Sequence, residues 1–274
     1  MAGDLTISTI NGGAIGAKNA LINGNFGINQ RAVSGTVTLS AGAYGHDRFK
    51  AGASGCTYTF ATSNNITTLT ITAGSLIQVI EGINLQSGTY TLSWTGTAQG
   101  KIGGGSYAGS GVTETVTGGT NLNIEFDTGT LSLVQLEAGS VATPFEHRLY
   151  GQELALCQRY YYRTSGGSIG ARITQAGYAI NTTVVRVHNV FPVAMRVAPT
   201  AMEQSGTAAD YSVTGFGTIR IVCSAVPTIV GAQDTHANTN FTVASGLTAW
   251  TAGACASSTG VSTATAYLAW STEL

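Results

Sequence analysis

The sequence predicts an all-β protein with two antiparallel β-sandwich (jelly-roll-like) domains joined by one short α-helix. Charged residues make up only 9% of the chain, against about 25% in an average soluble domain. Glycine contributes 37 of 274 residues, while 43% of the residues are hydrophobic, so the chain has many turn formers and enough apolar residues for a core. Short stretches of alternating apolar and polar residues, separated by turn signals, are typical of antiparallel strands.

Residues 1–20 are rich in Gly, Ala and Thr, and we expect them to form an N-terminal arm that attaches the chain to other proteins or makes contacts between subunits. A first domain is expected over 21–143. In its segment TYTLSWT, residues Tyr90, Leu92 and Trp94 share one face of a half-buried strand. The expected strands of this domain span 36–42, 56–62, 67–74, 76–82, 88–96, 112–119, 122–129 and 130–139.

A linker helix is expected within 144–163. Pro144 ends any strand because it has no N–H for a sheet ladder. Tyr150, Leu154, Cys157 and Tyr161 then recur at helical spacing and form one narrow apolar seam. A seam of this width suits contacts between copies of the chain. An isolated helix this short would not be stable in water, so it must pack on a domain, on its copies, or on both.

Strand signals resume over 164–274, where we expect a second β-sandwich. The expected strands span 169–177, 179–195, 211–217, 218–226, 240–246, 249–255 and 262–274. The last of them places Leu268 and Trp270 on one face and Tyr267 and Ala269 on the other.

Composition argues against several classes of function. The net charge is −1 with only three lysines, whereas nucleic-acid binding requires clustered basic side chains, so no nucleic-acid partner is expected. No apolar run reaches the ~20 residues of a membrane helix, and the N-terminal stretch lacks the features of a secretory signal. The four cysteines have no metal-site spacing and are expected to be small buried residues, although Cys223 and Cys255 could pair across two strands.

No catalytic, metal or cofactor motif is found, and we expect a protein that is not an enzyme and needs no cofactor. Asp47 and Arg48 are expected to form a local ion pair at the start of a strand. Glu146 and Glu153 could be a glycosidase carboxylate pair, but structural salt bridges are favoured. The segment GKIGGGSYAGSG (100–111) has glycine spacing like that of a phosphate loop, but it lacks the GK[ST] ending and is expected to be a flexible hairpin loop.

Three residues are candidates for carbohydrate binding. Trp250 follows a turn and could stack on a sugar ring, whereas Trp94 and Trp270 are expected in the cores. Asp234 and His236 lie in the polar segment AQDTHANTN, which could contact a sugar or be plain surface.

The segment VQLEAGSVATPFEHRLYGQELALCQRYY (134–161) resembles one that recurs in bacteriophage tail-fibre and related virion proteins. NALINGNFGINQR (19–31) and Asp47-Arg48-Phe49 are similar to motifs of the jelly-roll domain, like a carbohydrate-binding module, that precedes this segment in such fibres. FPVAMRVAPT (191–200) and AYLAWSTEL (266–274) resemble their terminal β-sandwich. This resemblance implies a phage virion protein, but it carries over no sugar-binding residue.

The leading functional hypothesis is a homotrimeric tail-fibre or spike subunit that binds a glycan receptor on the host surface. It would be located in the virion, contact other virion proteins through the arm, and not insert into membranes. The arm is short and no long shaft is evident, so the alternative is a capsid head-fibre or decoration protein with a purely structural role. A fibre-borne glycan hydrolase is a third hypothesis, which lacks a carboxylate constellation.

Overall fold

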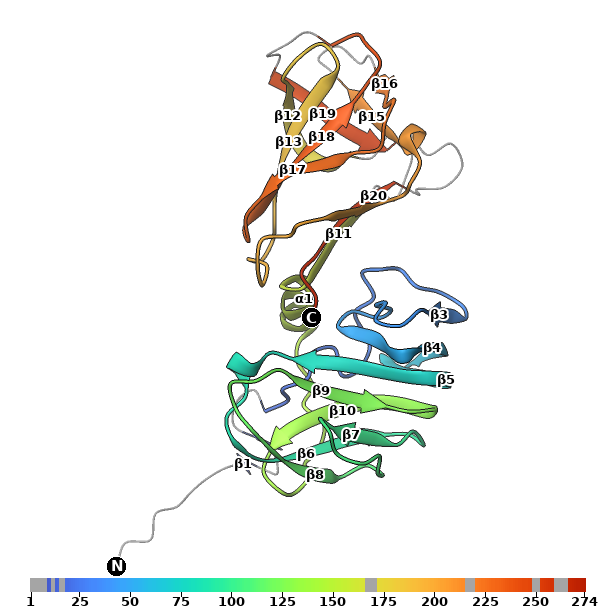
Figure 1. Ribbon diagram of the computed structural model, residues 1–274, viewed down its shortest axis with the longest axis vertical. Helices are drawn as coiled ribbons and strands as arrows, with labels where there is room; N and C mark the ends of the chain where they lie inside the picture. The colour runs from blue at the N-terminus through green and yellow to red at the C-terminus, as the bar shows by residue number, and fades with distance from the viewer. Residues whose placement is uncertain are drawn as a thin grey trace, which may run out of the picture. The chain divides into compact units, whose positions relative to one another are not determined.

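The chain forms mostly antiparallel β-structure with one α-helix among the residues that the structure describes (Figure 1). This computed structural model describes residues 9–10, 13–14, 18–165, 172–214, 220–247, 252–258 and 266–274. The all-β prediction is therefore confirmed at the level of secondary structure. The chain divides into two compact units, Met1–Cys157 and Gln158–Leu274, which are described in turn.

The N-terminal unit contains ten strands and one short 3-10 helix among its described residues. Strands β1 and β2 pair with each other, and the other strands form one sheet system in which β3-β4-β5-β10-β6-β8 is the main path and β9 joins β5 to β7. The elements are β1 (Thr9–Ile10), β2 (Gly13–Ala14), β3 (Val37–Leu39), β4 (Phe49–Ser63), β5 (Ile66–Ile80), η1 (Gly82–Asn84), β6 (Gly88–Thr95), β7 (Gly100–Ile102), β8 (Val112–Val116), β9 (Leu122–Phe126) and β10 (Gly129–Ala138).

Strand β5 is one continuous strand where two were predicted. Its first half pairs with β10 and its second half with β9. The change of partner coincides with a bulge at which Cys56 of β4 pairs with Gly74 of β5. Gly74 has a φ of +72°, and a Cβ at this position would lie 2.0 Å from the carbonyl oxygen of Gly55. Only glycine fits there, which allows the paired strands to bend together.

The core of the N-terminal unit collects the apolar faces of these strands. Tyr90, Leu92 and Trp94 are all buried in it, which confirms the predicted face of β6. Trp94 also donates its indole N–H to the carbonyl of Ala98 at 3.0 Å. It is therefore a satisfied core residue, as predicted, and is not a ligand platform.

The motif NALINGNFGINQR (19–31) forms a network of buried polar groups with Asp47 in this unit. Asn23 is fully buried and donates to the carbonyls of Ile28 and Asp47 at 2.8 and 3.1 Å. The Asp47 carboxylate accepts from the backbone N–H of Gln30 at 2.6 Å and from its side-chain amide at 2.7 Å. Arg48 is buried and donates to the carbonyl of Val79 at 2.7 Å. The motif is explained by folding, because its polar groups hold the first loop against the strands.

Residues 140–158 hold the end of the N-terminal unit against its beginning. The Glu146 carboxylate accepts from the backbone N–H groups of Lys18 and Asn19 at 3.1 and 2.8 Å. Arg148 lies 3.4 Å from both Glu146 and Glu153, and it donates to the carbonyls of Asn19 and Leu21. The predicted salt-bridge role of the two glutamates is thus confirmed.

Helix α1 (Tyr150–Gln158) is shorter than predicted, and its buried face differs. Tyr161 is not helical, because it begins β11 and pairs with Ser271. Within α1, Cys157 is buried and Leu154 half-buried, but Tyr150 is 68% exposed. Glu153, predicted to lie off the seam, is buried and accepts a hydrogen bond from the backbone N–H of Asn23. Packing on the N-terminal unit therefore follows the ion pair between Glu153 and Arg148. The predicted helical placement is wrong for Tyr161, while the contact of the seam with other copies of the chain stays a prediction.

The C-terminal unit contains a three-stranded sheet, β11-β20-β14, and a seven-stranded sheet, β16-β15-β19-β12-β13-β18-β17. The elements are β11 (Tyr161–Ser165), β12 (Arg172–Ala179), β13 (Val184–Val190), β14 (Met202–Gln204), η2 (Ala208–Asp210), β15 (Tyr211–Thr214), β16 (Arg220–Val222), β17 (Thr228–Ala232), β18 (His236–Thr242), β19 (Ala252–Ser258) and β20 (Tyr267–Ser271).

The core of the C-terminal unit joins its two sheets. Leu268 and Trp270 of the smaller sheet pack with Val185, Val187 and Phe241 of the larger one. This confirms the predicted inward face of β20, although Ala269 on the other face is buried as well.

Three of the cysteines, Cys56, Cys157 and Cys223, are buried as predicted. Burial raises the pKa of the Cys56 thiol to about 11 and that of Cys223 to about 12. The side chain of Cys255 lies outside the described residues, and so does the question of whether it pairs with Cys223.

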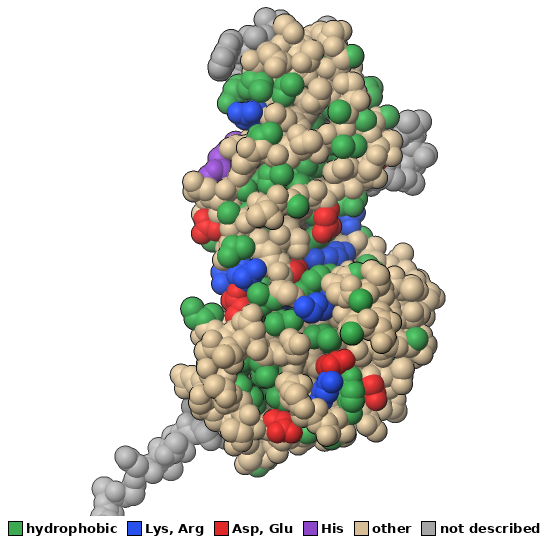
Figure 2. Space-filling view, in the orientation of Figure 1, with side chains coloured by type: hydrophobic (Ala, Val, Ile, Leu, Met, Phe, Trp, Pro, Cys, Tyr) green, Lys and Arg blue, Asp and Glu red, His purple; other side chains and the backbone are tan. Residues whose placement is uncertain are grey.

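Few charged side chains are present on the surface displayed in Figure 2, and they are scattered among uncharged ones. Among the described residues, no helix combines the length and the apolar content that crossing a membrane requires.

Candidate functional site

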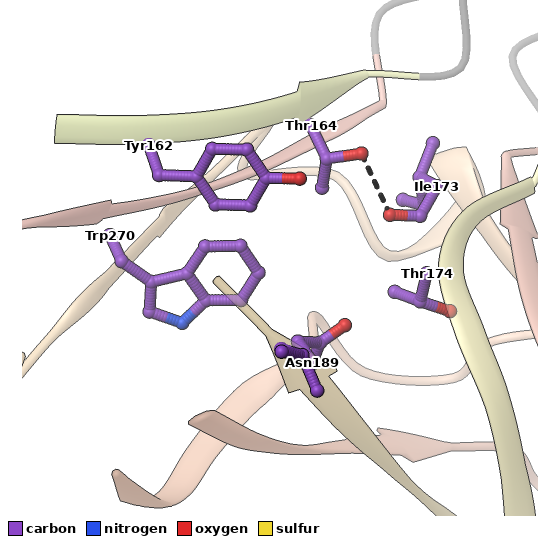
Figure 3. Close-up of a pocket in the computed structure, with 7 residues that line it drawn as sticks. Tyr162, Thr164, Ile173, Thr174, Asn189 and Trp270 are labelled. Atoms are coloured by element: carbon purple, nitrogen blue, oxygen red, sulfur yellow. Dashed lines mark hydrogen bonds between the residues drawn. The ribbon is translucent and has the colours of Figure 1, made fainter. Parts of the chain in front are cut away.

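A cavity of about 210 Å³ lies in the C-terminal unit, at the junction of its two sheets (Figure 3). β11 and β20 of the smaller sheet supply Tyr162, Thr164 and Trp270, and β12 and β13 of the larger sheet supply Ile173, Thr174, Asn189 and Val190. We call this cavity the C-terminal pocket. It arises where the paired strands β11 and β20 approach the larger sheet without filling the space between them.

An aromatic pair forms one side of the pocket. Tyr162 and Trp270 are direct cross-strand neighbours, and their rings are stacked with an angle of 11° between planes and 5.9 Å between centroids. Phe191 packs edge-on against both rings, at 6.0 and 5.4 Å. Since Trp270 is fully buried and held by two aromatic neighbours, this wall is rigid.

The side chains of Thr164 and Asn189 in the pocket have hydrogen-bond partners, whereas the indole N–H of Trp270 has none. The Thr164 hydroxyl donates to the carbonyl of Ile173 at 2.9 Å, as Figure 3 shows. The side-chain amide of Asn189 donates to Thr239 at 3.0 Å and to the carbonyl of Ala237 at 3.3 Å, which leaves its Oδ1 as the acceptor available on the pocket side. The indole N–H of Trp270 is buried and makes no hydrogen bond to the protein. A buried donor without a partner is unfavourable, and a ligand or water can relieve that cost.

The phenol of Tyr162 adds a neutral hydroxyl. Burial raises the pKa of this group, so it stays protonated at physiological pH and can both donate and accept. In Figure 3 the hydroxyl is directed toward Thr164.

The chemistry of the pocket fits a small, uncharged, hydroxyl-bearing ligand. Its volume equals about seven water molecules at ~30 Å³ each, and it is below the roughly 300–1,000 Å³ of sites for larger ligands. No Lys, Arg, Asp or Glu lines it, so it offers no charge to pair with an ion. Trp270 is fully buried, so the half-buried Tyr162, beside neutral donors and acceptors, is the ring suited to contact a single sugar.

The residues predicted for carbohydrate binding do not line this pocket. His236 is half-buried and begins β18, which corrects its expected place in a loop. Asp234 is exposed in the turn before β18, and its backbone carbonyl accepts from Met195 at 2.7 Å. Trp250 lies outside the described residues. None of the predicted helix residues is in the pocket lining: Tyr150, Leu154 and Cys157 belong to α1, and Tyr161 belongs to β11.

A second polar cluster, in the N-terminal unit, is internally satisfied. Glu125 accepts from Ser75 at 2.6 Å and pairs with Lys101 at 2.9 Å. Lys101 also lies over the ring of Tyr107, 4.6 Å from its centroid. Burial and a hydrogen bond to Glu125 raise the pKa of Tyr107 to about 12. Part of the predicted flexible loop is in fact strand β7, paired with β9, and this cluster fixes it in place.

The described residues contain no group of three or more His, Cys, Asp or Glu that could enclose a metal ion. Comparison with protein-family models, curated proteins and solved structures finds no match to this chain.

The lining of the C-terminal pocket was missed at the sequence level. Tyr162 was assigned to the linker helix and Trp270 to the core, and Asn189 was not considered. Their approach depends on the pairing of β11 with β20, strands that are separated by about a hundred residues. The only local signal is the run of aromatic residues at Tyr160, Tyr161 and Tyr162 immediately before a strand.

Proposed function

We propose that this chain is a bacteriophage virion protein, a homotrimeric tail-fibre or spike subunit that binds a glycan on the host surface. The observation that supports binding is the C-terminal pocket, with its stacked Tyr162 and Trp270 and its unpartnered indole N–H. The phage assignment rests on the resemblance of 134–161 and of the motifs at 19–31 and 47–49 to fibre proteins. The finer fold belongs to the same proposal, with both units being antiparallel sandwiches of the jelly-roll type.

A pocket for one sugar ring gives weak binding, and a fibre overcomes this by repetition. The volume and neutral lining allow few contacts to each ligand. Several identical sites on one assembly gain avidity of roughly 10²–10⁴ over a single site if they engage one surface together. A trimer that displays three such pockets is therefore a suitable receptor-binding device.

Exposed apolar side chains near the start of α1 support association with further copies of the chain. Val141, Leu149 and Tyr150 are 72, 74 and 68% exposed. Exposed apolar side chains mark interfaces where they form one contiguous patch, and these three lie within ten positions of the sequence. We propose that these residues face other copies of this chain in the trimer.

Blocking the pocket tests the binding function. Val190 lines the pocket and is 49% exposed, so Val190→Trp can cover the opening without disturbing the core. Val230 on β17 is 44% exposed and does not line the pocket, so Val230→Trp is a matched control. The intact oligomer of each variant is applied to a glycan array that includes bacterial surface polysaccharides.

The expected result is glycan binding by the unmodified chain and by Val230→Trp, and its loss in Val190→Trp. Equal binding by both variants would show that the pocket is not the site. If the unmodified oligomer binds no glycan while labelled protein is found on assembled particles, the structural alternative of a capsid head-fibre or decoration protein is favoured. Loss of polysaccharide viscosity on incubation would instead favour the hydrolase hypothesis.

A further inference from the structure

Two histidines lie against each other on the outward face of the larger sheet in the C-terminal unit. The imidazole rings of His188 on β13 and His236 on β18 are 4.4 Å apart between centroids, with 41° between their planes. In the strand register, His188 pairs with Asn238 and Val190 pairs with His236, so the two histidines are diagonal cross-strand neighbours. His188 is exposed and His236 is half-buried. Solvent therefore reaches the pair directly.

Both rings are oriented through the same nitrogen. Nδ1 of His188 lies 3.0 Å from Oδ1 of Asn238, and Nδ1 of His236 lies 3.2 Å from the hydroxyl of Thr235. Because an amide oxygen can only accept, the His188 contact places the proton on Nδ1 and leaves the lone pair on Nε2. A metal-bound histidine is oriented in this way, with one nitrogen held by an oxygen and the other directed at the metal.

The other two histidines have no such arrangement. His46 is buried, hydrogen-bonded to the Tyr58 hydroxyl at 2.9 Å, and burial lowers its pKa to about 4. His147 is exposed, and its ring neighbour is Phe145, at 5.0 Å. All four histidines lie within the described residues, so His188 and His236 form the one close pair of imidazoles in the chain.

We propose that His188 and His236 form a two-imidazole site for a divalent transition-metal ion of the Zn²⁺, Ni²⁺ or Cu²⁺ class. Two nitrogens bound tetrahedrally to one ion are about 3.4 Å apart for metal–nitrogen bonds of ~2.1 Å. The ring centroids of such a pair are about 5.3 Å apart, because each centroid lies about 3.2 Å from the ion. The two rings, now 4.4 Å apart at their centroids, therefore need to separate by only about 1 Å. Imidazole ligands favour these ions over Mg²⁺ and Ca²⁺, which prefer oxygen.

The site supplies two protein ligands, and the remaining positions go to water or to an external donor. Among the described residues no third His, Cys, Asp or Glu joins the pair. Asp234, exposed two positions before His236, adds a negative charge nearby. Arg186, two positions before His188 on the same face of β13, pairs with Asn240 and donates to its Oδ1 at 3.0 Å. The open coordination positions make this a surface site that can also bind a donor from outside the chain.

The test uses the full chain without a polyhistidine tag, first stripped with a chelator. Binding of Ni²⁺ is measured by isothermal titration calorimetry for the unmodified chain and for His188→Ala, His236→Ala and the control His147→Ala. We expect one ion per chain in the unmodified protein. Each pair variant should weaken binding roughly tenfold or more, because a second ligand held in place acts at high effective concentration. His147→Ala should bind as the unmodified chain does.

Electron paramagnetic resonance of bound Cu²⁺ gives an independent readout, since two equatorial nitrogens should fall to one in either pair variant. Circular dichroism of the metal-free variants establishes that they remain folded, and both pair positions lie at or near the surface. The proposal is overturned if the folded pair variants bind Ni²⁺ as tightly as the unmodified chain, or if His147→Ala removes binding. A Cu²⁺ spectrum with one nitrogen in the unmodified chain would overturn it as well.

Discussion

The bulge at Gly74 allows the stability of the N-terminal unit to be tested by one methyl group. Gly74→Ala introduces a Cβ at a φ of +72° and 2.0 Å from the Gly55 carbonyl oxygen. Gly35→Ala is the matched control, because Gly35 has a φ of +64° but nothing within 4 Å of the added Cβ. The two variants share the conformational cost of a left-handed alanine, and only one adds the steric clash.

The expected magnitudes follow from these two terms. A left-handed L-residue costs about 1–2 kcal/mol, which is the whole effect expected for Gly35→Ala. In Gly74→Ala the Cβ contact must open from 2.0 Å to at least 3.0 Å between two paired backbones. Overpacking of this kind adds about 1–3 kcal/mol. We therefore expect Gly74→Ala to lower the free energy of unfolding of the N-terminal unit by about 2–5 kcal/mol.

Two buried cysteines allow each unit to be followed separately. Cys56 lies opposite Gly74 in the N-terminal unit, and Cys223 is buried in the C-terminal unit. Their raised pKa values keep both thiols unreactive while folded. Samples equilibrated in guanidinium chloride are pulsed with a thiol reagent, and labelling at each cysteine is measured by peptide mass spectrometry. Labelling of Cys223 provides the internal reference for the C-terminal unit.

We expect the Cys56 transition of Gly74→Ala to lie roughly 0.3–0.8 M below that of Gly35→Ala, for a guanidinium slope of about 4 kcal/mol/M. If the two variants had the same Cys56 midpoint, the close approach of the strands at the bulge would contribute nothing to stability. The assigned role of Gly74 would then be refuted.

Three further outcomes are expected. His46→Gln should reduce the loss of stability between pH 7 and pH 5 by about 2 kcal/mol in urea unfolding. Burial lowers the pKa of His46 to about 4, whereas the ordinary value is near 6.5. Between these two pH values the unfolded chain binds one more proton at His46 than the folded chain does, so the free energy of unfolding decreases as the pH is lowered. An unchanged pH dependence in the variant would contradict this. Glu153→Ala should cost the N-terminal unit about 1–3 kcal/mol in the Cys56 assay, because it removes a partner of Arg148 and the acceptor for the backbone N–H of Asn23; a cost below about 0.5 kcal/mol would make the contact unimportant. For the proposed trimer, replacing Leu149 and Tyr150 by Ser should shift the assembly toward monomer in light scattering. A trimer of unchanged stability would exclude these residues from the proposed interface.

Alternation and turn signals were sufficient to predict most strands. The face of β6 with Tyr90, Leu92 and Trp94 could be read directly, since a period of two is a local property. Strand β7 was missed because its glycine-rich segment has little strand propensity, and it forms through pairing with β9 and the contacts of Lys101. Its existence depends on tertiary partners that a local pattern does not contain.

The end of the helix and the lining of the pocket could not be predicted from the sequence, because both depend on residues that are far apart in the chain. Helical spacing continued through Tyr161, but the strand preference of consecutive tyrosines and the pairing of Tyr161 with Ser271 end the helix earlier. Glu153 looked like a surface residue because its partner Asn23 is 130 positions away. The C-terminal pocket likewise requires Tyr162, Asn189 and Trp270 to meet from three strands. Long-range contacts of this kind are decided by the whole fold.

The contacts of Glu146 and Arg148 with residues 18–21 have a mechanical consequence. They clamp together the two places where the chain passes into and out of the body of the N-terminal unit. Tension applied along the polypeptide would be carried across this clamp, and the strands between Leu21 and Ala138 would bear little of it. Under pulling force, the clamp should break first as a separate event, before the sheet system extends. A module mounted in this way can keep its shape while the chain on either side is stretched.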